Sequence, residues 1–254
     1  MSQSRYFLDF SYLGDAYHGW QRQPNVISVQ QVIEEALFTT TRKETLVFGA
    51  GRTDTGVHAK QMIAHFDAEL DIKKEKQLVY QLNSYLPRDI AVKHLFKVNN
   101  DAHARFDAIE RSYEYHLCTE KDPFEAHRHY HIKSIPDIEL MNQAAKILFE
   151  YEDFKCFSKT KTDVKTFLCK IIHAEWTVKD SNYVFKISAD RFLRNMVRAI
   201  VGTLLEIGLK KQDLNVFRKI IESKNRSEAG LSVPSNGLFL TKITYPKSIY
   251  INNE

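Results

Sequence analysis

The order of strand and helix patterns is the feature that most constrains the fold of this chain. Residues 5–12 alternate between the two faces of a strand, and Ser28 then precedes a run of apolar side chains at helical spacing that extends to Leu37. Further patterns follow, typical of strands at 46–50 and 61–68, of a helix at 75–85 and of a strand at 90–98. The first hundred residues therefore predict the order β-α-β-β-α-β.

A similar order restarts at Ser112. Strand patterns lie near 113–119, 170–178, 183–188 and 238–245, and helix patterns lie at 138–150 and 192–208. We expect an α+β protein built from two tandem ferredoxin-like (split β-α-β) units with a mainly antiparallel sheet. No low-complexity linker separates the halves, residues 1–105 and 106–254, so they are expected to form one continuous core.

Composition narrows the class of protein. Of the 254 residues 43% are hydrophobic and 27% charged, which is enough to bury a core, and no apolar run approaches the ~20 residues that cross a bilayer. The first ten residues include Arg5 and Asp9 and lack the apolar stretch of a secretion signal. Cys118, Cys156 and Cys169 show no C-x-x-C spacing. We therefore expect a cytoplasmic protein with reduced thiols.

Positive charge is concentrated in the second half of the chain. From Lys155 to Arg226 there are 16 Lys or Arg and 7 Asp or Glu, a net charge of +9 where the whole chain has +4. Such a segment suits a polyanion, because each phosphate that it neutralises releases counterions. A solvated lysine face is the alternative interpretation. On the predicted helix 192–208, Arg194 and Arg198 fall opposite the apolar stripe.

The loop at 49–58, G-A-G-R-T-D-T-G-V-H, carries the strongest chemical signal and lies between two predicted strands. Arg52 and Asp54 are two residues apart, so in an extended segment they share a face, and the guanidinium would keep Asp54 ionised for nucleophilic or general-base work. The loop lacks the spacing of a P-loop or of a dinucleotide-binding fingerprint. On the loop alone, the sequence favours a turn with a charge pair at a strand end.

Segment 52–59, R-T-D-T-G-V-H-A, resembles the R-T-D-x-G-V-H-A signature of the TruA-type tRNA pseudouridine synthase family. Further blocks resemble motifs of that family and follow in its order: Y-L-G-D-A-Y-H-G-W-Q-R-Q at 12–23, S-V-Q at 28–30, L-N-x-x-L-P-x-D-I at 82–90, H-A-R-F at 103–106, R-S-Y-E-Y at 111–115, F-L-x-x-M-V-R-A-I-V-G at 192–202 and G-L-F-L at 237–240. The resemblance extends over nearly the whole chain.

The resemblance implies an isomerase with a pseudouridine synthase core. It would convert uridines on the 3′ side of the tRNA anticodon stem-loop, positions 38–40, to pseudouridine. By the same resemblance Asp54 would be the nucleophile, Arg52 a substrate-positioning neighbour, Tyr113 the ring that stacks on the flipped base, and Arg198 the ion-pair partner of Asp54. It further implies a homodimer with tRNA as partner, no cofactor, no metal and no membrane. The sequence departs from the family at Thr55, where Ala is common.

The chemistry keeps two routes open, because a carboxylate can attack either C1′ of the ribose or C6 of the uracil. The C5 proton must leave after the base has been rejoined through C5. The resemblance suggests Tyr113 as the group that removes this proton, although a phenol with a reference pKa of about 10 is a modest base.

Two other functions stay in competition at this level. The first is an RNA-binding module without chemistry, in which Asp54 is dispensable. The second is a metal-dependent hydrolase that uses His127, His129 and His131, with Glu125 nearby. Alternate positions would place the three imidazoles on one strand face, but no nearby Asp or Cys completes a ligand set, so the sequence favours a polar strand or loop.

Overall fold

The computed structural model describes residues 3–69, 75–160 and 164–251. The chain divides into two compact units. Unit 1 comprises Met1–Ile109 and Leu240–Glu254, and unit 2 comprises Glu110–Phe239. The C-terminal segment thus groups with the first unit, while the predicted halves at 1–105 and 106–254 stay a prediction. Within the described ranges, the structure has no helix long and apolar enough to span a bilayer.

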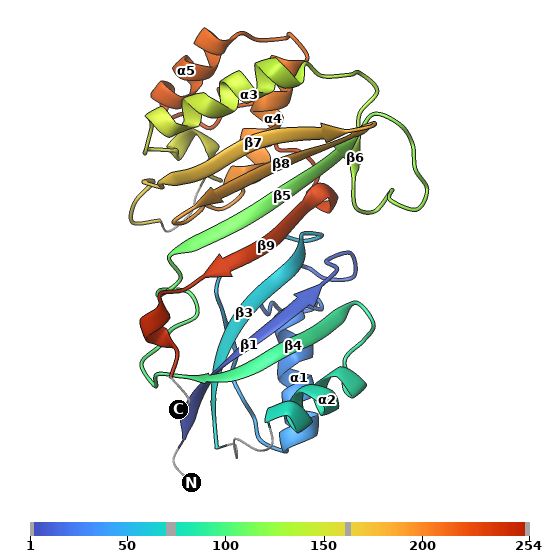
Figure 1. Ribbon diagram of the computed structural model, residues 1–254, viewed down its shortest axis with the longest axis vertical. Helices are drawn as coiled ribbons and strands as arrows, with labels where there is room; N and C mark the ends of the chain where they lie inside the picture. Colours follow the sequence, from blue (N-terminus) through green and yellow to red (C-terminus); the bar gives the residue numbers. More distant parts are fainter. Residues whose placement is uncertain (1–2, 70–74, 161–163, 252–254) are drawn as a thin grey trace. The chain divides into compact units, whose positions relative to one another are not determined.

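Unit 1 is built on an antiparallel sheet. Strand β1 (Ser4–Tyr12) lies between β3 (His58–Ala68) and β4 (Ile90–Val98) and is antiparallel to both. The strands β4, β1 and β3 lie side by side in that order (Figure 1). The short β2 (Phe48–Gly49) is antiparallel to β3 on its other side, which gives the order β4-β1-β3-β2. Strand β9 (Leu238–Thr244) also reaches unit 1, where the Gln61 side-chain oxygen accepts a hydrogen bond from the Ile243 N–H at 2.9 Å.

Two helices pack against this sheet. Helix α1 (Val29–Thr41) begins after Ser28, whose hydroxyl accepts a hydrogen bond from the Gln31 N–H at 3.3 Å, so the predicted N-cap is confirmed. Helix α2 (Glu75–Tyr85) and strand β4 have the predicted bounds. The core between sheet and helices is made of side chains with almost no exposed surface, among them Tyr6, Leu8, Phe10, Ile33, Leu37 and Leu82.

Unit 2 repeats a mixture of antiparallel strands and helices. Strand β5 (Glu110–Cys118) is antiparallel to β8 (Asn182–Ala189), and β8 is antiparallel to β7 (Ile171–Lys179), while the short β6 (Tyr130–His131) runs parallel to β5. Helices α3 (Ile138–Ile147), α4 (Met196–Gly208) and α5 (Leu214–Ser223) complete the unit (Figure 1). The predicted α+β class with mainly antiparallel strands is confirmed.

The sequence prediction misplaces the start of one helix of unit 2 and omits another. Helix α4 begins at Met196 instead of residue 192, because Asn195 has a φ of 67° and this left-handed residue separates the preceding turn from the helix. Arg194 therefore lies outside the helix that carries Arg198. Helix α5 was not predicted, although Asp213 caps it by accepting a hydrogen bond from the Val216 N–H at 2.9 Å.

Candidate active site

Asp54 lies in the loop between β2 and β3 of unit 1. Its carbonyl oxygen accepts a hydrogen bond from the Val57 N–H at 3.2 Å, and Gly56 has a φ of 76°, which together are typical of a type II turn. Glycine is favoured at such a position because side chains with a Cβ rarely adopt positive φ. The Asp54 side chain is half-buried, whereas Arg52 and Thr55 of the same loop are exposed.

The loop between β1 and α1, residues 13–28, contacts the Asp54 loop and is called the supporting loop below. The Trp20 N–H donates to the Thr53 carbonyl at 3.2 Å. Gly19 has a φ of 84°, and a Cβ added there would lie 2.3 Å from the Thr53 oxygen; one added at Gly14 would lie 2.2 Å from the Val57 oxygen. The two loops are therefore in direct backbone contact, and glycine at these two positions is what allows it.

Side chains fix the same loop at both ends. The Tyr12 hydroxyl lies 2.9 Å from the Thr53 hydroxyl. At the other end, Nδ1 of the fully buried His58 accepts a hydrogen bond from the Gly14 N–H at 2.9 Å. These contacts hold the backbone on either side of Asp54. Fixing the backbone on both sides of Asp54 limits the positions that its carboxylate can take.

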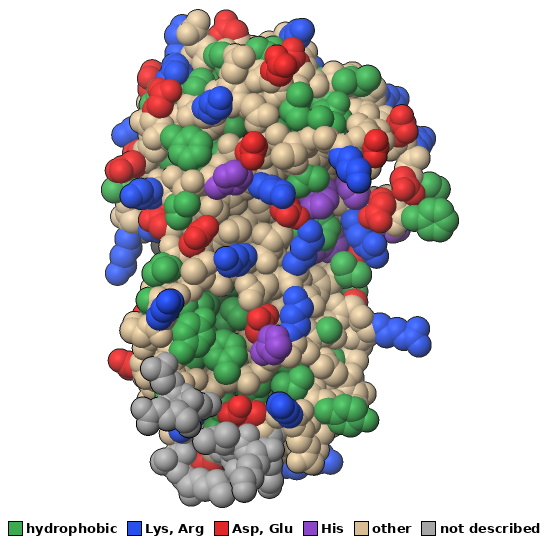
Figure 2. Space-filling model, viewed as in Figure 1, with side chains coloured by type: hydrophobic (Ala, Val, Ile, Leu, Met, Phe, Trp, Pro, Cys, Tyr) green, Lys and Arg blue, Asp and Glu red, His purple; other side chains and the backbone are tan. Residues whose placement is uncertain are grey.

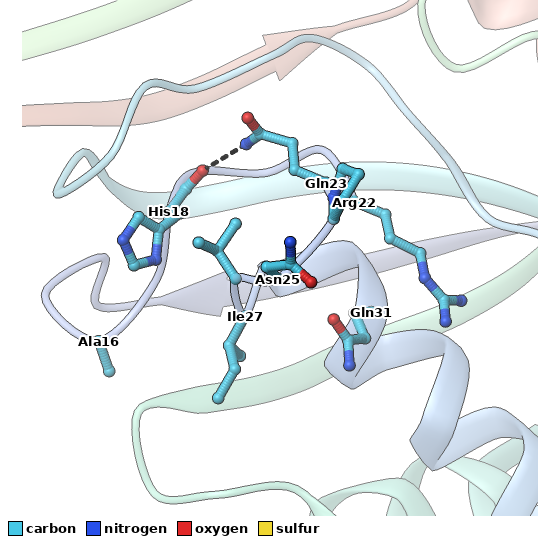
Figure 3. Close-up of a pocket in the computed structure, with 9 residues that line it drawn as sticks. Ala16, His18, Arg22, Gln23, Asn25, Ile27 and Gln31 are labelled. Carbon is cyan, nitrogen blue, oxygen red and sulfur yellow. Dashed lines mark hydrogen bonds between the residues drawn. The ribbon is translucent and has the colours of Figure 1, made fainter.

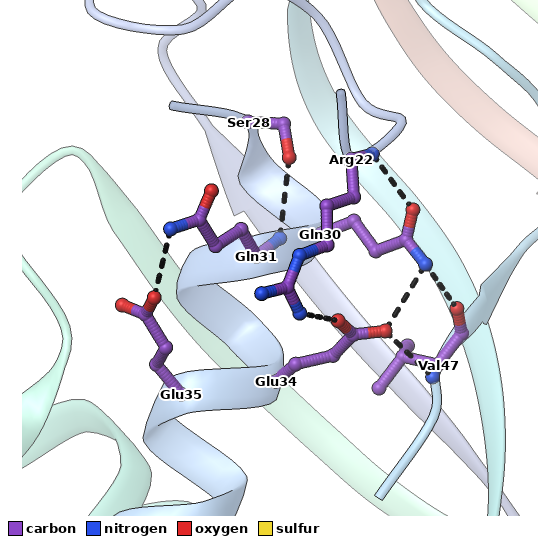
Figure 4. Close-up of polar contacts among 7 residues, drawn as sticks. All are labelled: Arg22, Ser28, Gln30, Gln31, Glu34, Glu35 and Val47. Atoms are coloured by element: carbon purple, nitrogen blue, oxygen red, sulfur yellow. Dashed lines mark hydrogen bonds and ion pairs between the residues drawn. The ribbon is translucent and has the colours of Figure 1, made fainter. Parts of the chain in front are cut away.

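Hydrogen bonds to the buried Glu34 carboxylate of helix α1 join the supporting loop to the start of strand β2 (Figure 4). Glu34 accepts hydrogen bonds from the Arg22 guanidinium at 3.2 Å, the Gln30 amide at 3.0 Å and the Val47 N–H at 3.2 Å. The Gln30 side chain also accepts from the Arg22 N–H at 2.9 Å and donates to the Val47 carbonyl at 3.1 Å. The network thus ties the supporting loop to the residue that precedes β2.

A surface groove of about 620 Å³ lies beside this supporting loop (Figure 3). Its lining comprises Ala16, His18, Arg22, Gln23, Pro24, Asn25, Val26, Ile27 and Gln31. These side chains offer amide, imidazole, guanidinium and apolar groups, but none of them is a carboxylate or a thiol. The groove therefore offers hydrogen bonds and packing, whereas the carboxylate that the sequence analysis singled out is in the Asp54 loop.

Tyr113 lies on β5 in unit 2, paired with Ile187 of β8. Its half-buried ring meets the Phe192 ring edge-on, with 5.2 Å between centroids and 88° between planes. Two residues along the strand, Tyr115 is fully buried and donates its hydroxyl to the Pro234 carbonyl at 2.9 Å. Tyr113 is thus the more accessible of the two rings.

Arg198 lies in the first turn of α4 and is half-buried. Its Nε donates to the Val233 carbonyl at 2.8 Å, and the Val233 N–H donates to the Arg198 carbonyl at 3.2 Å. Two hydrogen bonds therefore join this arginine to a segment 35 residues further along the chain. The sequence did not indicate this link, because it depends on a tertiary contact. The ion pair between Asp54 and Arg198 stays a prediction.

The basic segment, Lys155 to Arg226, belongs to unit 2, with residues 161–163 outside the described part of the chain. On the face drawn in Figure 2, Lys and Arg side chains alternate with acidic ones instead of covering one uninterrupted area. Several of the cations are in ion pairs, including Arg218 with Glu150 and Lys224 with Asp153. Part of the positive charge is therefore paired with carboxylates within unit 2.

In the part of the chain that the structure describes, His127, His129 and His131 are not arranged as a set of metal ligands. Burial and the neighbouring His116 lower the pKa of His129, whose ring lies 3.6 Å from the Glu125 carboxylate and 5.3 Å from the His116 ring. Within the described residues, no group of three or more His, Cys, Asp or Glu side chains is arranged to hold a metal ion. The metal-dependent hydrolase thus gains no support from His127, His129 and His131.

Comparison with known proteins identifies the family. A model of the tRNA pseudouridine synthase family matches residues 10–107 and 144–246, which include Arg52, Asp54 and Arg198. The chain belongs to the TruA-type tRNA pseudouridine synthase family. Membership of this family assigns it to the isomerases. Tyr113 lies between the two matched ranges, so its assignment depends on the Y-E-Y motif alone.

Curated relatives are similar over nearly their full length. The tRNA pseudouridine synthase A of Bacteroides fragilis is 54% identical over 251 residues, which cover 98% of this chain and 100% of the relative. The enzyme of the same name from Parabacteroides distasonis is 52% identical, covering 97% and 98%. That of Bacillus subtilis is 38% identical, covering 92% and 96%. The similarity therefore includes both units of the fold.

Proposed function

We propose that this chain isomerises uridine to pseudouridine in tRNA, on the 3′ side of the anticodon stem-loop, with Asp54 as the nucleophile. The observation that carries the proposal is the construction of the Asp54 loop. Gly56 forms its turn, and Trp20, Tyr12 and His58 take part in the hydrogen bonds that fix the backbone around it. An RNA-binding module without chemistry has no need of an aspartate whose backbone is fixed on both sides.

The reaction rearranges bonds within one nucleotide. The Asp54 carboxylate forms a bond to C1′ or C6, the N1–C1′ bond breaks, and the base turns and is rejoined to C1′ through C5. The bond between Asp54 and the nucleotide then breaks and returns the free carboxylate. The proton on C5 then leaves and N1 gains one, so the product is an isomer of uridine. No oxidant, reductant or group donor enters this balance.

The other site residues take roles that suit their chemistry. Arg198 would pair with Asp54 and keep it ionised in a site that excludes water. Tyr113 would stack on the uracil after it has left the helix, a contact worth about 1–3 kcal/mol in other complexes of bases with aromatic rings. Arg52, exposed beside Asp54, would contact the phosphate backbone. The pairing of Asp54 with Arg198 and the stacking on Tyr113 are parts of the proposal.

The partners and the finer fold assignment belong to the same proposal. We infer that each unit is a split β-α-β fold, which the antiparallel order β4-β1-β3-β2 supports in unit 1 and the order β5-β8-β7 supports in unit 2.

The protein would act as a homodimer on a folded tRNA and bind it by phosphate contacts and shape. The basic segment would supply many of these contacts.

Release of tritium from tRNA that carries uridine labelled at C5 tests the activity, because rejoining at C5 must expel that hydrogen. The wild-type protein is compared with Asp54→Asn, and with Asp101→Asn as a matched control on an exposed turn of unit 1. We expect release by the wild type and the control, and none by Asp54→Asn with tRNA binding retained. Binding of tRNA by the wild type without release would favour the RNA-binding module instead.

A second assay tests the target position. Transcripts in which single uridines of the anticodon stem-loop are replaced by cytidine are incubated with the enzyme, and the remaining pseudouridines are mapped by chemical adduct formation and primer extension. Loss of signal only on replacement of 3′-side uridines supports the proposed position. Modification elsewhere in the tRNA contradicts the position while leaving the activity intact.

A further inference from the structure

The segment Ala229–Val233 of unit 2 lies directly against α4. The Gly230 N–H donates to the Thr203 hydroxyl at 3.0 Å. A Cβ added to Gly202 would lie 1.8 Å from the Leu231 carbonyl oxygen, and one added to Gly230 would lie 3.0 Å from the Thr203 backbone. Helix and segment therefore meet backbone to backbone, which the two glycines permit.

Arg226 fixes this segment by three hydrogen bonds. One guanidinium nitrogen donates to the Ala229 carbonyl at 3.3 Å and to the Gly230 carbonyl at 3.1 Å, and the other donates to the Ser232 hydroxyl at 2.8 Å. The same hydroxyl accepts from the Asn195 side chain at 2.6 Å. Ser232 thus links Arg226 to the residue that precedes α4.

Side-chain burial does not explain how the middle of the segment is held. Leu231 is 86% exposed although it is a large apolar residue, so its side chain contributes little packing. The hydrogen bonds of Arg226, Ser232 and Gly230 instead define the path of the backbone there. That path ends at Val233, whose carbonyl accepts from Arg198 Nε at 2.8 Å.

Arg198 depends on this contact for its orientation. An arginine side chain has several rotatable bonds, and fixing them costs conformational entropy. A carbonyl at a fixed place removes much of that freedom before substrate binds, because the bond to Nε sets the plane of the guanidinium. Any shift of Val233 would therefore turn the guanidinium of Arg198.

We propose that Arg226 is a positioning residue: it holds the segment Ala229–Val233 so that Val233 orients Arg198 for the reaction. This inference rests on the role of Arg198 in the proposed function. Arg226 itself touches neither substrate nor reacting atoms in this proposal. It acts through Ser232, the backbone of the segment and the Val233 carbonyl.

Single variants supply the first test. Arg226→Gln is expected to lower kcat about 10- to 100-fold with little change in KM, since a misplacement of about 1 Å can cost about 100-fold in rate. The matched control is Arg5→Gln in unit 1, because Arg5 also makes three hydrogen bonds, two to Asp67 and one to the Ala102 carbonyl. The control is expected to lower the melting temperature similarly and to leave kcat unchanged.

Ser232 provides a milder variant in case Arg226→Gln does not fold. Ser232→Ala removes the hydroxyl that Arg226 and Asn195 share and is expected to lower kcat, whereas Ser232→Thr keeps a hydroxyl and is expected to restore it. Equal rates for the Ala and Thr variants and the wild type would overturn the inference.

A double-mutant cycle with Arg198→Lys gives the decisive readout, because residues that act as a unit have non-additive effects. If Arg226 acts through Arg198, Arg226→Gln lowers kcat in the wild type but changes it less than twofold in the Arg198→Lys background. An equal loss in both backgrounds overturns this inference and leaves the proposed role of Arg198 standing. The same holds if Arg226→Gln has the wild-type rate while Arg198→Lys is impaired. A wild-type rate for Arg198→Lys overturns the proposed role of Arg198 and this inference with it.

Discussion

The Trp20 N–H donates a hydrogen bond to the Thr53 carbonyl at 3.2 Å, one residue before the proposed nucleophile. On the other side, the Trp20 carbonyl accepts from the Gln30 N–H at 3.0 Å in the first turn of α1. One peptide segment therefore connects the start of a helix to the Asp54 loop. The position of the carboxylate depends on residues that take no part in the chemistry.

The first prediction concerns Gly19, which lies beside this contact. In Gly19→Ala the new Cβ meets the Thr53 oxygen at 2.3 Å on a backbone with a φ of 84°, so the Asp54 loop must shift. We expect a loss of about 1–3 kcal/mol in the free energy of unfolding and a rate lower by about tenfold or more. Urea denaturation and tritium release measure the two effects.

Gly51→Ala is the matched control for stability, because a Cβ at Gly51 meets no atom within 4 Å. Its free energy of unfolding should stay within about 0.5 kcal/mol of the wild type. Equal stability of the Gly19 and Gly51 variants would contradict the proposed contact between the two loops.

The second prediction concerns the buried carboxylate of Glu34. Glu34→Ala leaves the Val47 N–H and the Gln30 amide without their shared acceptor, so the free energy of unfolding should fall by about 2–3 kcal/mol. Glu35→Ala on the same helix removes only an exposed bond to Gln31 and should change it by less than about 0.5 kcal/mol. Equal losses of free energy of unfolding in the two variants would show that the buried network contributes no more to stability than the exposed bond.

Much of the fold was predictable because its signals are local. The bounds of α2 and β4 follow from spacing and from Pro87 between them, and the Ser28 cap needs only residues three apart. The turn at Gly56 was also indicated by the sequence, since a glycine that adopts positive φ suits a turn after Asp54. Helix α5 had a local signal too, in Asp213 and Phe217, and was missed.

The remainder depends on contacts between distant residues. The start of α4 is set by Asn195, whose left-handed backbone accompanies a side-chain bond to Ser232, 37 residues away. Gly14 and Gly19 allow close backbone contact with the Asp54 loop, and the spacing of residues in the sequence does not indicate such a contact. Resemblance thus found both the motif around Asp54 and the block at 12–23, but no pattern in the sequence showed that the two are in contact.

The third prediction concerns the three cysteines, which are all free and buried. Burial raises the pKa of the Cys156 and Cys169 thiols to about 12, so little thiolate exists at neutral pH. We expect slow reaction of the native protein with a disulfide reagent such as DTNB and rapid reaction of three thiols in denaturant. Rapid reaction of Cys156 or Cys169 in the native protein, located by peptide mapping, would be inconsistent with this burial.

The fourth prediction concerns pH and His65. Burial, and secondarily the neighbouring His103, lowers the pKa of His65 from 6.5 to about 4. The neutral ring accepts a hydrogen bond from the Ala104 N–H at Nδ1 and stacks on Phe48. Between pH 6.5 and 4 the unfolded chain therefore binds a proton that the folded chain does not, and stability falls as the pH falls through this window.

Urea denaturation at several pH values compares the wild type with His65→Phe, which keeps a ring against Phe48 but cannot titrate. The wild-type curve should be steeper between pH 6.5 and 4 by up to about 1.4 kcal/mol per pH unit, the slope for one proton. His173→Gln, which alters an exposed histidine on β7, should keep the wild-type slope. If His65→Phe kept it too, another group would have to account for the acid sensitivity, because only the loss of the His65 proton site separates the two curves.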